Sequence, residues 1–287
     1  MLTHLLCPVT LGSKFEPALH FISGAQRLNR LRLEPQMETK SELLPLLDTL
    51  YESSNPTRKW LHCSRRDWII GKIIETARER PGRAIEIGFG AGVYLPSLAE
   101  AFGEVVATDL DQAHIDHARA IAAKYPNLHL MRDDVLDSKL PEHNFSLVLC
   151  SEVIEHIPNS ESVLAAMHRL LEPGGILLLS TPQRWSLMEM AAKIAFLPGI
   201  VNLVRRIYGE AVFDMEHINS MTARETERQL NRAGFRICER YKSGMYIPLV
   251  AEFAGDRGRS FEEWLERRLR GHALDWMLWT QYYVAQA

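Results

Sequence analysis

Apolar runs alternate with helix-like segments through the middle of this chain. Five runs are typical of strands, at residues 83–88, 104–109, 127–132, 145–150 and 175–180. Between most of them, apolar residues recur at the spacing of a helix face, near residues 92–102, 111–124 and 159–171. Strands that are apolar almost throughout favour a parallel sheet that is covered on both faces. The pattern therefore predicts a doubly wound, Rossmann-like α/β domain.

The segments on either side of this core are less regular. Helices are predicted near residues 41–52 and over about residues 65–80, with a turn at "SSNPT" between them, and Pro81-Gly82 ends the second helix. Towards the other end, "TARETERQLNRAGFRICERYKSG" predicts a helix followed by a strand. The closing "LWTQYYVAQA" predicts a last strand with alternating faces.

These elements divide the chain into an extension and a main domain. We predict a helical N-terminal extension, residues 1–64, and an α/β domain, residues 65–287. Two insertions interrupt the domain, at residues 184–219 and at residues 246–275. The first is rich in Leu, Met, Ile, Val and Phe, whereas the second contains a charged helix, "SFEEWLERRLRGH".

The turn after the first predicted strand, "IEIGFGAGVY", contains Gly88, Gly90 and Gly92. Glycines let the backbone turn sharply and let a ligand approach without meeting a Cβ atom. A dinucleotide fingerprint would place a small residue where this chain has Val93. Glu86 would repel a pyrophosphate but attract a cation. The turn therefore favours S-adenosylmethionine, which has a sulfonium and an ammonium group and no phosphate, with Glu86 near its amino-acid end.

Acidic residues also follow the second and third predicted strands. Asp109 can accept both hydroxyls of a ribose, with Leu110 beside it, although a helix cap is the alternative; Asp111 is the better cap candidate. After the third strand, Asp134 and Val135 are candidates for the adenine amine and ring, with Asp133 not excluded. An ordinary turn acid is an equally good interpretation of that last position.

The motifs, in their order, resemble those of the class I S-adenosylmethionine-dependent methyltransferases. The resemblance rests on "AIEIGFGAGVY", "VVATDLD", "DDVLD", "FSLVLCSEVIEHIP" and "LLEPGGILLLSTP", and it is strong over about residues 60–182. "SEVIEHIP" and "STP" are most similar to the ubiquinone- and menaquinone-type small-molecule enzymes. The resemblance implies S-adenosylmethionine as cofactor, a seven-stranded sheet with an antiparallel last strand, and an N-terminal extension that covers the cofactor.

The segment "CSEVIEHIP", after the fourth strand, contains candidate catalytic groups. Cys150 and Glu152 are placed to line the cofactor pocket, and His156 is the candidate general base, with Glu155 as a second. A surface or capping histidine is the alternative interpretation of His156. Glu152 and His156 are four residues apart, so a helical turn would place both on one face, as a metal pair requires. Because no further ligand cluster is evident, we predict no metal site.

His217, in "FDMEHINSMTARE", is another candidate base. In the family that the chain resembles, this segment often reaches the mouth of the active site, although an ordinary loop histidine fits equally well. Thr222 and Glu225 predict a capping box at the start of the following helix. The insertion before this segment predicts a helical lid, divided by Pro198-Gly199. Peripheral membrane contact through residues 185–208 is the alternative.

Composition and charge narrow the function classes. A net charge of −3 and a pI of about 6.4 disfavour a nucleic-acid substrate. The four scattered cysteines contain no CxxC pair and suit free thiols in a reducing cytosol. With no apolar run of bilayer length and no basic residues ahead of the first apolar stretch, we expect a cytoplasmic protein.

The predicted function is methyl transfer to a small, partly apolar organic acceptor, at an oxygen atom of a natural product, quinone or lipid-like molecule. The alternatives are N- or C-methylation of a lipid or secondary metabolite, and a non-catalytic, cofactor-binding partner subunit. A nicotinamide oxidoreductase is disfavoured by Val93 and Glu86. The sequence names neither the acceptor nor the oligomeric state.

Overall fold

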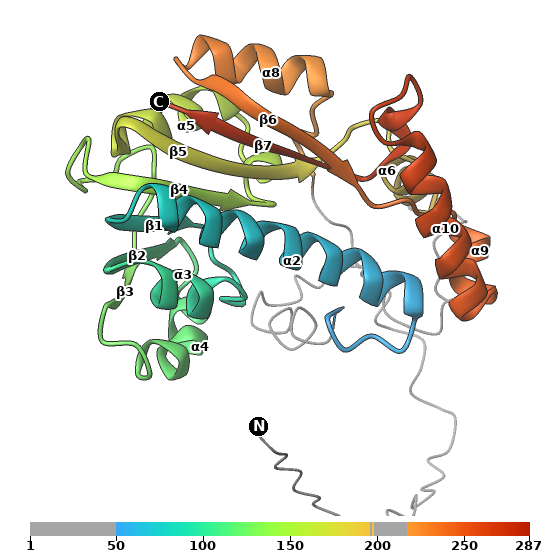
Figure 1. The fold of residues 1–287 in the computed structure, drawn as a ribbon, viewed down its shortest axis with the longest axis horizontal. Coiled ribbons are helices and arrows are strands. Elements are labelled where there is room, and N and C mark those ends of the chain that lie inside the picture. The colour runs from blue at the N-terminus through green and yellow to red at the C-terminus, as the bar shows by residue number, and fades with distance from the viewer. Residues whose placement is uncertain (1–49, 196, 198–216) are drawn as a thin grey trace, which may run out of the picture. The chain divides into compact units, whose positions relative to one another are not determined.

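The structure is a computed structural model and describes residues 50–195, 197 and 217–287. Its centre is a seven-stranded sheet in the order β3-β2-β1-β4-β5-β7-β6 (Figure 1). The strands are β1 (Arg83–Ile87), β2 (Glu104–Asp109), β3 (Leu128–Arg132), β4 (Phe145–Ser151), β5 (Leu171–Pro182), β6 (Arg236–Ser243) and β7 (Thr280–Gln286).

The strand pairing confirms the predicted fold. Neighbouring strands from β3 to β5 are parallel, whereas β7 lies between β5 and β6 and is antiparallel to both. All five strands predicted in the core are present, and the fifth is longer than expected because its pairing extends to Pro182. The parallel strands therefore place their carboxyl ends along one edge, where α/β proteins bind ligands.

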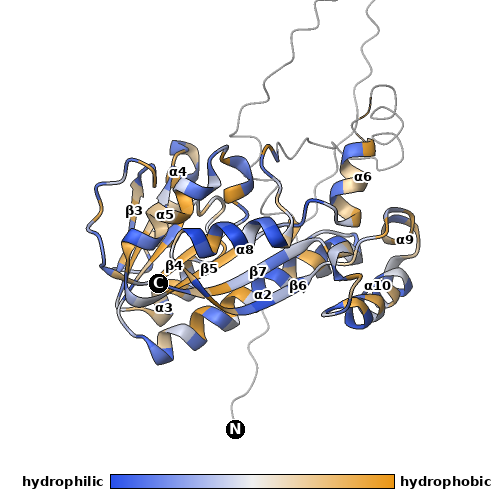
Figure 2. Ribbon diagram, turned by 90° about the horizontal axis from the view of Figure 1, so that it is seen from above, coloured by the Kyte–Doolittle hydropathy of each residue, from blue (hydrophilic) through white to orange (hydrophobic). Residues whose placement is uncertain are grey.

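Helices cover both faces of the sheet. Those described are α2 (Pro56–Glu79), α3 (Leu95–Ala101), α4 (Gln112–Ala122), α5 (Ser160–Leu170), α6 (Leu187–Ala195), α8 (Ala223–Arg232), α9 (Pro248–Phe253), α10 (Gly255–Leu269), and two short 3₁₀ helices, η2 (Ile154–His156) and η3 (Asp275–Met277). Helices α2 and α3 lie on one side of the sheet, and α5 and α8 on the other (Figure 2). Along β4, Leu147 and Leu149 pack on the first side, and Val148 and Cys150 on the second. The near-continuous apolar sequence of β4 thus follows from burial on both faces.

The predicted helix caps are confirmed. Asp111 accepts a hydrogen bond from the Ala113 amide at the start of α4. Thr222 and Glu225 form the capping box of α8. A bridge between Gln183 and Met221 brings the two ends of the first insertion together, so this insertion leaves and rejoins the domain at one place.

The start predicted for the second helix is wrong. Helix α2 begins at Pro56 rather than near residue 65, because the Asn55 side chain accepts hydrogen bonds from the amides of Thr57 and Arg58. The predicted turn "SSNPT" is therefore a helix cap, and α2 crosses the expected boundary between residues 64 and 65. The first part of α2 is rich in charged residues and has no clear apolar stripe, so the periodicity of the sequence did not reveal this part of the helix. The other predicted helix, residues 41–52, lies almost entirely outside the described residues.

The second insertion holds the N-terminal half of α2 in place. Helix α10 packs beside this half (Figure 1), and its buried Glu262 accepts hydrogen bonds from the Thr57 hydroxyl (2.6 Å) and the Ile247 amide (2.7 Å). Glu266, one turn later, accepts from the amides of Gly244 and Met245. Within the described part of the chain, no helix combines the length and the apolar character needed to cross a membrane.

We predict that Glu262→Ala destabilises the protein by about 1–3 kcal/mol, because it leaves the buried Thr57 hydroxyl and the partly buried Ile247 amide without their acceptor. The measurement is urea unfolding followed by circular dichroism. The matched control is Glu263→Ala on the same helix, whose partly exposed ion pairs contribute little, so the change expected is within about 0.5 kcal/mol. Equal losses for the two variants would contradict the bridging role of Glu262.

Candidate active site

The glycine turn after β1 needs all three glycines, for two different reasons. Gly88, Gly90 and Gly92 have φ angles of +70°, +52° and +75°, a region that other residues rarely adopt. A Cβ atom on Gly88 would lie 2.6 Å from a methyl of Val153, and one on Gly92 would lie 2.9 Å from a methyl of Leu95. A Cβ atom on Gly90 would meet none of the described atoms within 4 Å. Gly90 therefore leaves open space beside the backbone, as a ligand requires.

Glu86 lies next to this turn, and its side chain is almost fully buried. Among the described residues, no group hydrogen-bonds to its Oε2 atom. Burial, and then the negative charge of Asp109, raise the pKa of Glu86 well above its ordinary value. A buried acid without a partner is costly, and a cationic group would relieve that cost. The residue fits the role predicted for it at the amino-acid end of S-adenosylmethionine.

Asp109 ends β2 and is linked directly to the glycine turn. Its Oδ2 atom accepts a hydrogen bond from the Gly90 amide (3.0 Å) and lies 3.0 Å from Nδ1 of His114, and its Oδ1 atom accepts from the Asp111 amide (2.9 Å). Burial raises the pKa of Asp109, but these contacts outweigh it and lower the pKa overall. A carboxylate with remaining lone pairs can still accept ribose hydroxyls. Leu110 is 58% exposed and offers an apolar surface beside it.

The acids after β3 lie in a turn at the surface, where Asp133 is half-buried and Asp134 is exposed. Asp134 is exposed, and its Oδ1 atom accepts from the Leu136 amide in a local turn, whereas Val135 is buried. The Asp133 amide donates to the Asp109 carbonyl, which fixes this turn beside β2. The adenine role of Asp134 and Val135 stays a prediction.

The backbone after β4 differs from the expected helical turn. Glu152 has a φ angle of +55° and precedes η2, so it does not share a helix face with His156 as predicted. Three contacts hold this unusual conformation. The Glu152 amide donates to the Ser180 carbonyl (3.0 Å), its Oε1 atom accepts from the Ser180 hydroxyl (2.9 Å), and its Oε2 atom accepts from Arg65 (2.6 Å). Strained backbone of this kind clusters at functional sites.

Arg65 and Ser180 were not identified from the sequence. Arg65 lies on α2, 87 residues before Glu152, and its guanidinium lies over the ring of Trp279. Neither spacing nor periodicity reveals such a long-range contact, although the "STP" element contains Ser180. Cys150, the last buried residue of β4, is fully enclosed, and burial followed by the charge of Glu155 raises the pKa of its thiol. Its side chain packs in the hydrophobic core on this face of the sheet, and its predicted place in the cofactor pocket stays a prediction.

The three predicted catalytic residues lie together. The rings of His156 and His217 are 5.2 Å apart between centroids, edge to face. The buried Glu155 accepts a hydrogen bond from the Thr181 hydroxyl through Oε2 (3.0 Å). One possible ligand atom from each of the three residues lies within 4.8 Å of the other two. The sequence found no third metal ligand because His217 comes from a distant segment.

A second buried carboxylate supports His217. Oε1 of Glu189, on α6, lies 3.0 Å from Nδ1 of His217 and also accepts from the Trp279 indole (3.4 Å). The next residues are tied to η2, because Asn219 donates from its amide to the Glu155 carbonyl and from its side chain to the Ile157 carbonyl. The segment that contains His217 is therefore fixed against the segment that contains Glu155.

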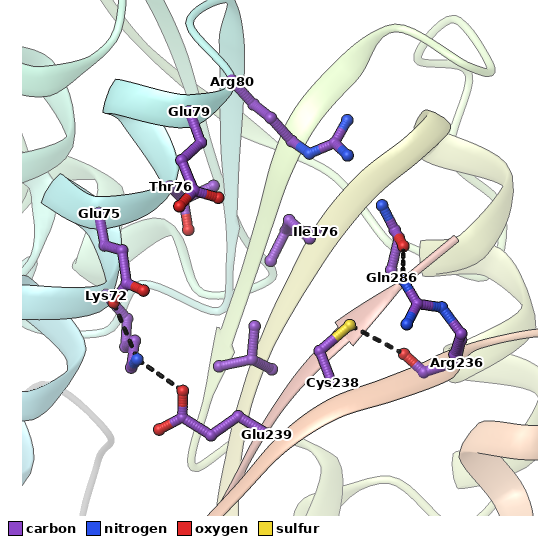
Figure 3. Close-up of a pocket in the computed structure, with 11 residues that line it drawn as sticks. Lys72, Glu75, Thr76, Glu79, Arg80, Ile176, Arg236, Cys238, Glu239 and Gln286 are labelled. Atoms are coloured by element: carbon purple, nitrogen blue, oxygen red, sulfur yellow. Dashed lines mark hydrogen bonds and ion pairs between the residues drawn. The ribbon is translucent and has the colours of Figure 1, made fainter.

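The pocket in Figure 3 lies elsewhere. It has a volume of about 290 Å³ and is lined by residues of α2, β6 and β7, several of them charged, together with Ile176 of β5. Lys72 pairs there with Glu239 and Glu75, and Arg236 with Gln286. This pocket is at the amino-terminal end of β5, away from the carboxyl edge, and we assign no function to it.

Comparison with known families agrees with this geometry. A family model described as a methyltransferase domain matches residues 63–240. The chain therefore belongs to this methyltransferase family. The expected class, the class I S-adenosylmethionine-dependent methyltransferases, is confirmed, and with it S-adenosylmethionine as the cofactor.

The individual relatives have low sequence identity to this chain and match only part of it. The ubiquinone biosynthesis O-methyltransferase of Methylococcus capsulatus is 30% identical over 129 residues, which cover 44% of this chain and 52% of that protein. The chain spans about half the length of the curated relatives it matches.

Two solved structures show the likeness of fold alone. An S-adenosylmethionine-dependent methyltransferase from Aquifex aeolicus has a TM-score of 0.53 at 13% identity, over 87% of this chain and 99% of that one. The [4+2]-cyclase SpnF has a TM-score of 0.57 at 14% identity, over 86% and 92%.

Glu86→Gln tests whether the buried carboxyl group of Glu86 lowers the stability of the ligand-free protein. A carboxyl group whose pKa is raised by folding takes up a proton on folding, so folding becomes less favourable as the pH rises from the unfolded-state towards the folded-state pKa. The amide removes this cost. We therefore expect the ligand-free variant to be more stable than the wild type at pH 7.

The same substitution should weaken S-adenosylmethionine binding at least tenfold in calorimetry, because it removes a charge opposite the ammonium group. Glu104→Gln, at a partly exposed position of β2, is the control and should change neither quantity. A Glu86→Gln variant that loses stability while binding the cofactor normally would show that Glu86 has a structural role instead.

Proposed function

We propose that this protein transfers the methyl group of S-adenosylmethionine to an oxygen atom of a small, partly apolar acceptor, such as a natural product, quinone or lipid-like molecule. The observation that carries this proposal is the His156–His217 pair, with Glu189 behind His217. An imidazole held by a buried carboxylate suits the removal of a proton from a hydroxyl group. The printed name of the Methylococcus capsulatus relative, an O-methyltransferase, supports the same choice of atom.

Different residues at the carboxyl edge would bind different parts of the cofactor. When bound, S-adenosylmethionine supplies an activated methyl group, so the protein has to align the acceptor and exclude water. Glu86 would hold the amino-acid end, and the open space at Gly90 would admit the ligand. Asp109 would accept the ribose hydroxyls, and Asp134 with Val135 would contact the adenine.

The acceptor would lie on the side of Glu152 that faces α2. There Arg65 and the rings of Tyr51, His62 and Trp279 form a cluster, with His62 between the other two rings at centroid distances of 5.9 and 5.8 Å. Burial, and then the charges of Arg65 and Arg58, lower the pKa of His62 to about 3, so its ring is neutral. A largely uncharged aromatic wall favours an acceptor that is aromatic or apolar in part.

The insertion at residues 184–219 would close this side as a lid. Its described helix, α6, contributes Glu189 to the site and carries the exposed side chains of Met190 and Ile194. The predicted division at Pro198-Gly199 lies outside the described residues, as does half of the segment predicted to contact a membrane, residues 185–208. Both remain proposals.

The proposal predicts that His217→Ala lowers kcat by about 10²-fold, since losing a general base typically costs 10²- to 10⁴-fold. The dissociation constant of S-adenosylmethionine should not change. The measurement is the release of S-adenosylhomocysteine with a panel of phenols, catechols and prenylated quinols, and His129→Ala, an exposed histidine of β3, is the control. Wild-type turnover in the His217→Ala variant would instead favour a nitrogen or carbon acceptor that needs no deprotonation here.

A further inference from the structure

We propose that Glu155, His156 and His217 bind a divalent transition-metal ion, of the Zn²⁺ or Mn²⁺ kind. The possible ligand atoms of these three residues lie within 4.8 Å of one another. Ligands around such an ion at about 2.1 Å can be at most about 4.2 Å apart, so small side-chain adjustments would close the site. Two histidines and one carboxylate are a recurrent ligand set for catalytic zinc and for non-haem iron.

The buried carboxyl group of Glu155 is the first independent sign of a ligand. The residue is completely buried, and its Oε2 atom is occupied by the Thr181 hydroxyl. No hydrogen-bonding partner for its Oε1 atom is present among residues 50–195, 197 and 217–287. Buried polar atoms are normally satisfied, so an unpartnered carboxylate oxygen beside two imidazoles calls for a cation.

The surroundings of His217 are the second sign. Glu189, whose side chain is 4% exposed, lies 3.0 Å from Nδ1 and leaves Nε2 as the remaining ring nitrogen. Metal-binding histidines almost always donate their other ring N–H to a carboxylate or a carbonyl, which fixes the ring and raises its basicity. Trp279 holds Glu189 in turn. The structure therefore contains the outer support that a metal ligand requires.

The site would keep an open coordination position. Glu152, the nearest other acid in sequence, lies outside this group of three residues, and its two oxygens are bound to Ser180 and Arg65. His156 is exposed, so the cluster opens towards solvent on its side. Three protein ligands and an accessible position are typical of a catalytic rather than a structural metal site.

The metal site rests on the proposed function for the transfer of the methyl group to an acceptor oxygen, but it replaces the base role given there to the histidines, and the binding of the ion itself does not depend on that function. A hydroxyl oxygen of the acceptor could occupy the open position, and a bound cation lowers the pKa of such a hydroxyl group. The proton would then leave the acceptor to solvent, and the two imidazoles would serve as ligands instead of bases. Acceptors with two adjacent oxygens, such as catechols, would suit this arrangement best.

The test is a metal titration of the full chain after chelator treatment, without cofactor or acceptor. Calorimetry with Zn²⁺ and with Mn²⁺, and the visible spectrum with Co²⁺, should show one ion per chain. His156→Ala, His217→Ala and Glu155→Gln should each weaken binding at least tenfold. Glu189→Gln, which alters a positioning residue, should weaken it about 10- to 100-fold. His129→Ala is the control and should bind like the wild type.

Each alternative outcome is distinct. A wild-type chain that binds none of these ions at one per chain overturns the site, as does binding that survives Glu155→Gln, which would indicate a surface histidine pair. S-adenosylmethionine affinity, measured in every variant, shows that each variant is folded. Failure of methyl transfer together with intact metal binding would count against the proposed function alone, and the reverse result would count against the metal site alone.

Discussion

The ion pair between Arg65 and Glu152 is the contact on which the site depends. It joins α2, from the N-terminal part of the chain, to the turn after β4, and Ser180 on β5 completes it. Glu152 keeps a positive φ angle because these partners hold it. Removing one member of a buried pair leaves the other charge without compensation, so the arrangement is tightly specified. The direction of the chain into η2, and thus the positions of Glu155 and His156, follow from it.

Buried acids are unusually concentrated at this edge of the sheet. Glu86 and Glu155 are both enclosed, and each is made harder to ionise by a neighbouring acid, Asp109 in one case and Glu152 in the other. A sheet edge built for stability alone would not need them. A cationic ligand would relieve this cost at both positions: the amino-acid end of the cofactor beside Glu86, and the proposed metal ion beside Glu155.

The sequence predicted the fold and the positions of several candidate site residues, because both depend on patterns among neighbouring residues. Glycines, strand-end acids and apolar runs are read from neighbouring residues, and β1 with Gly88–Gly92 and Asp109 lies where expected. The start of α2 was missed because its determinants, Asn55 and the buried contact to Glu262, include a partner far along the chain. Arg65, Glu189 and Thr181 were missed for the same reason, and His217 was found only through the family resemblance.

We expect the carboxyl edge of the sheet, rather than the pocket in Figure 3, to hold the methyl donor. A crystal structure of the full chain with S-adenosylhomocysteine tests it most directly. We expect the ammonium group near Glu86, the ribose hydroxyls on Asp109, and the sulfur facing the His156–His217 pair. A ligand bound anywhere else, or one whose amino-acid end points away from Glu86, would show that this edge does not bind the methyl donor as proposed.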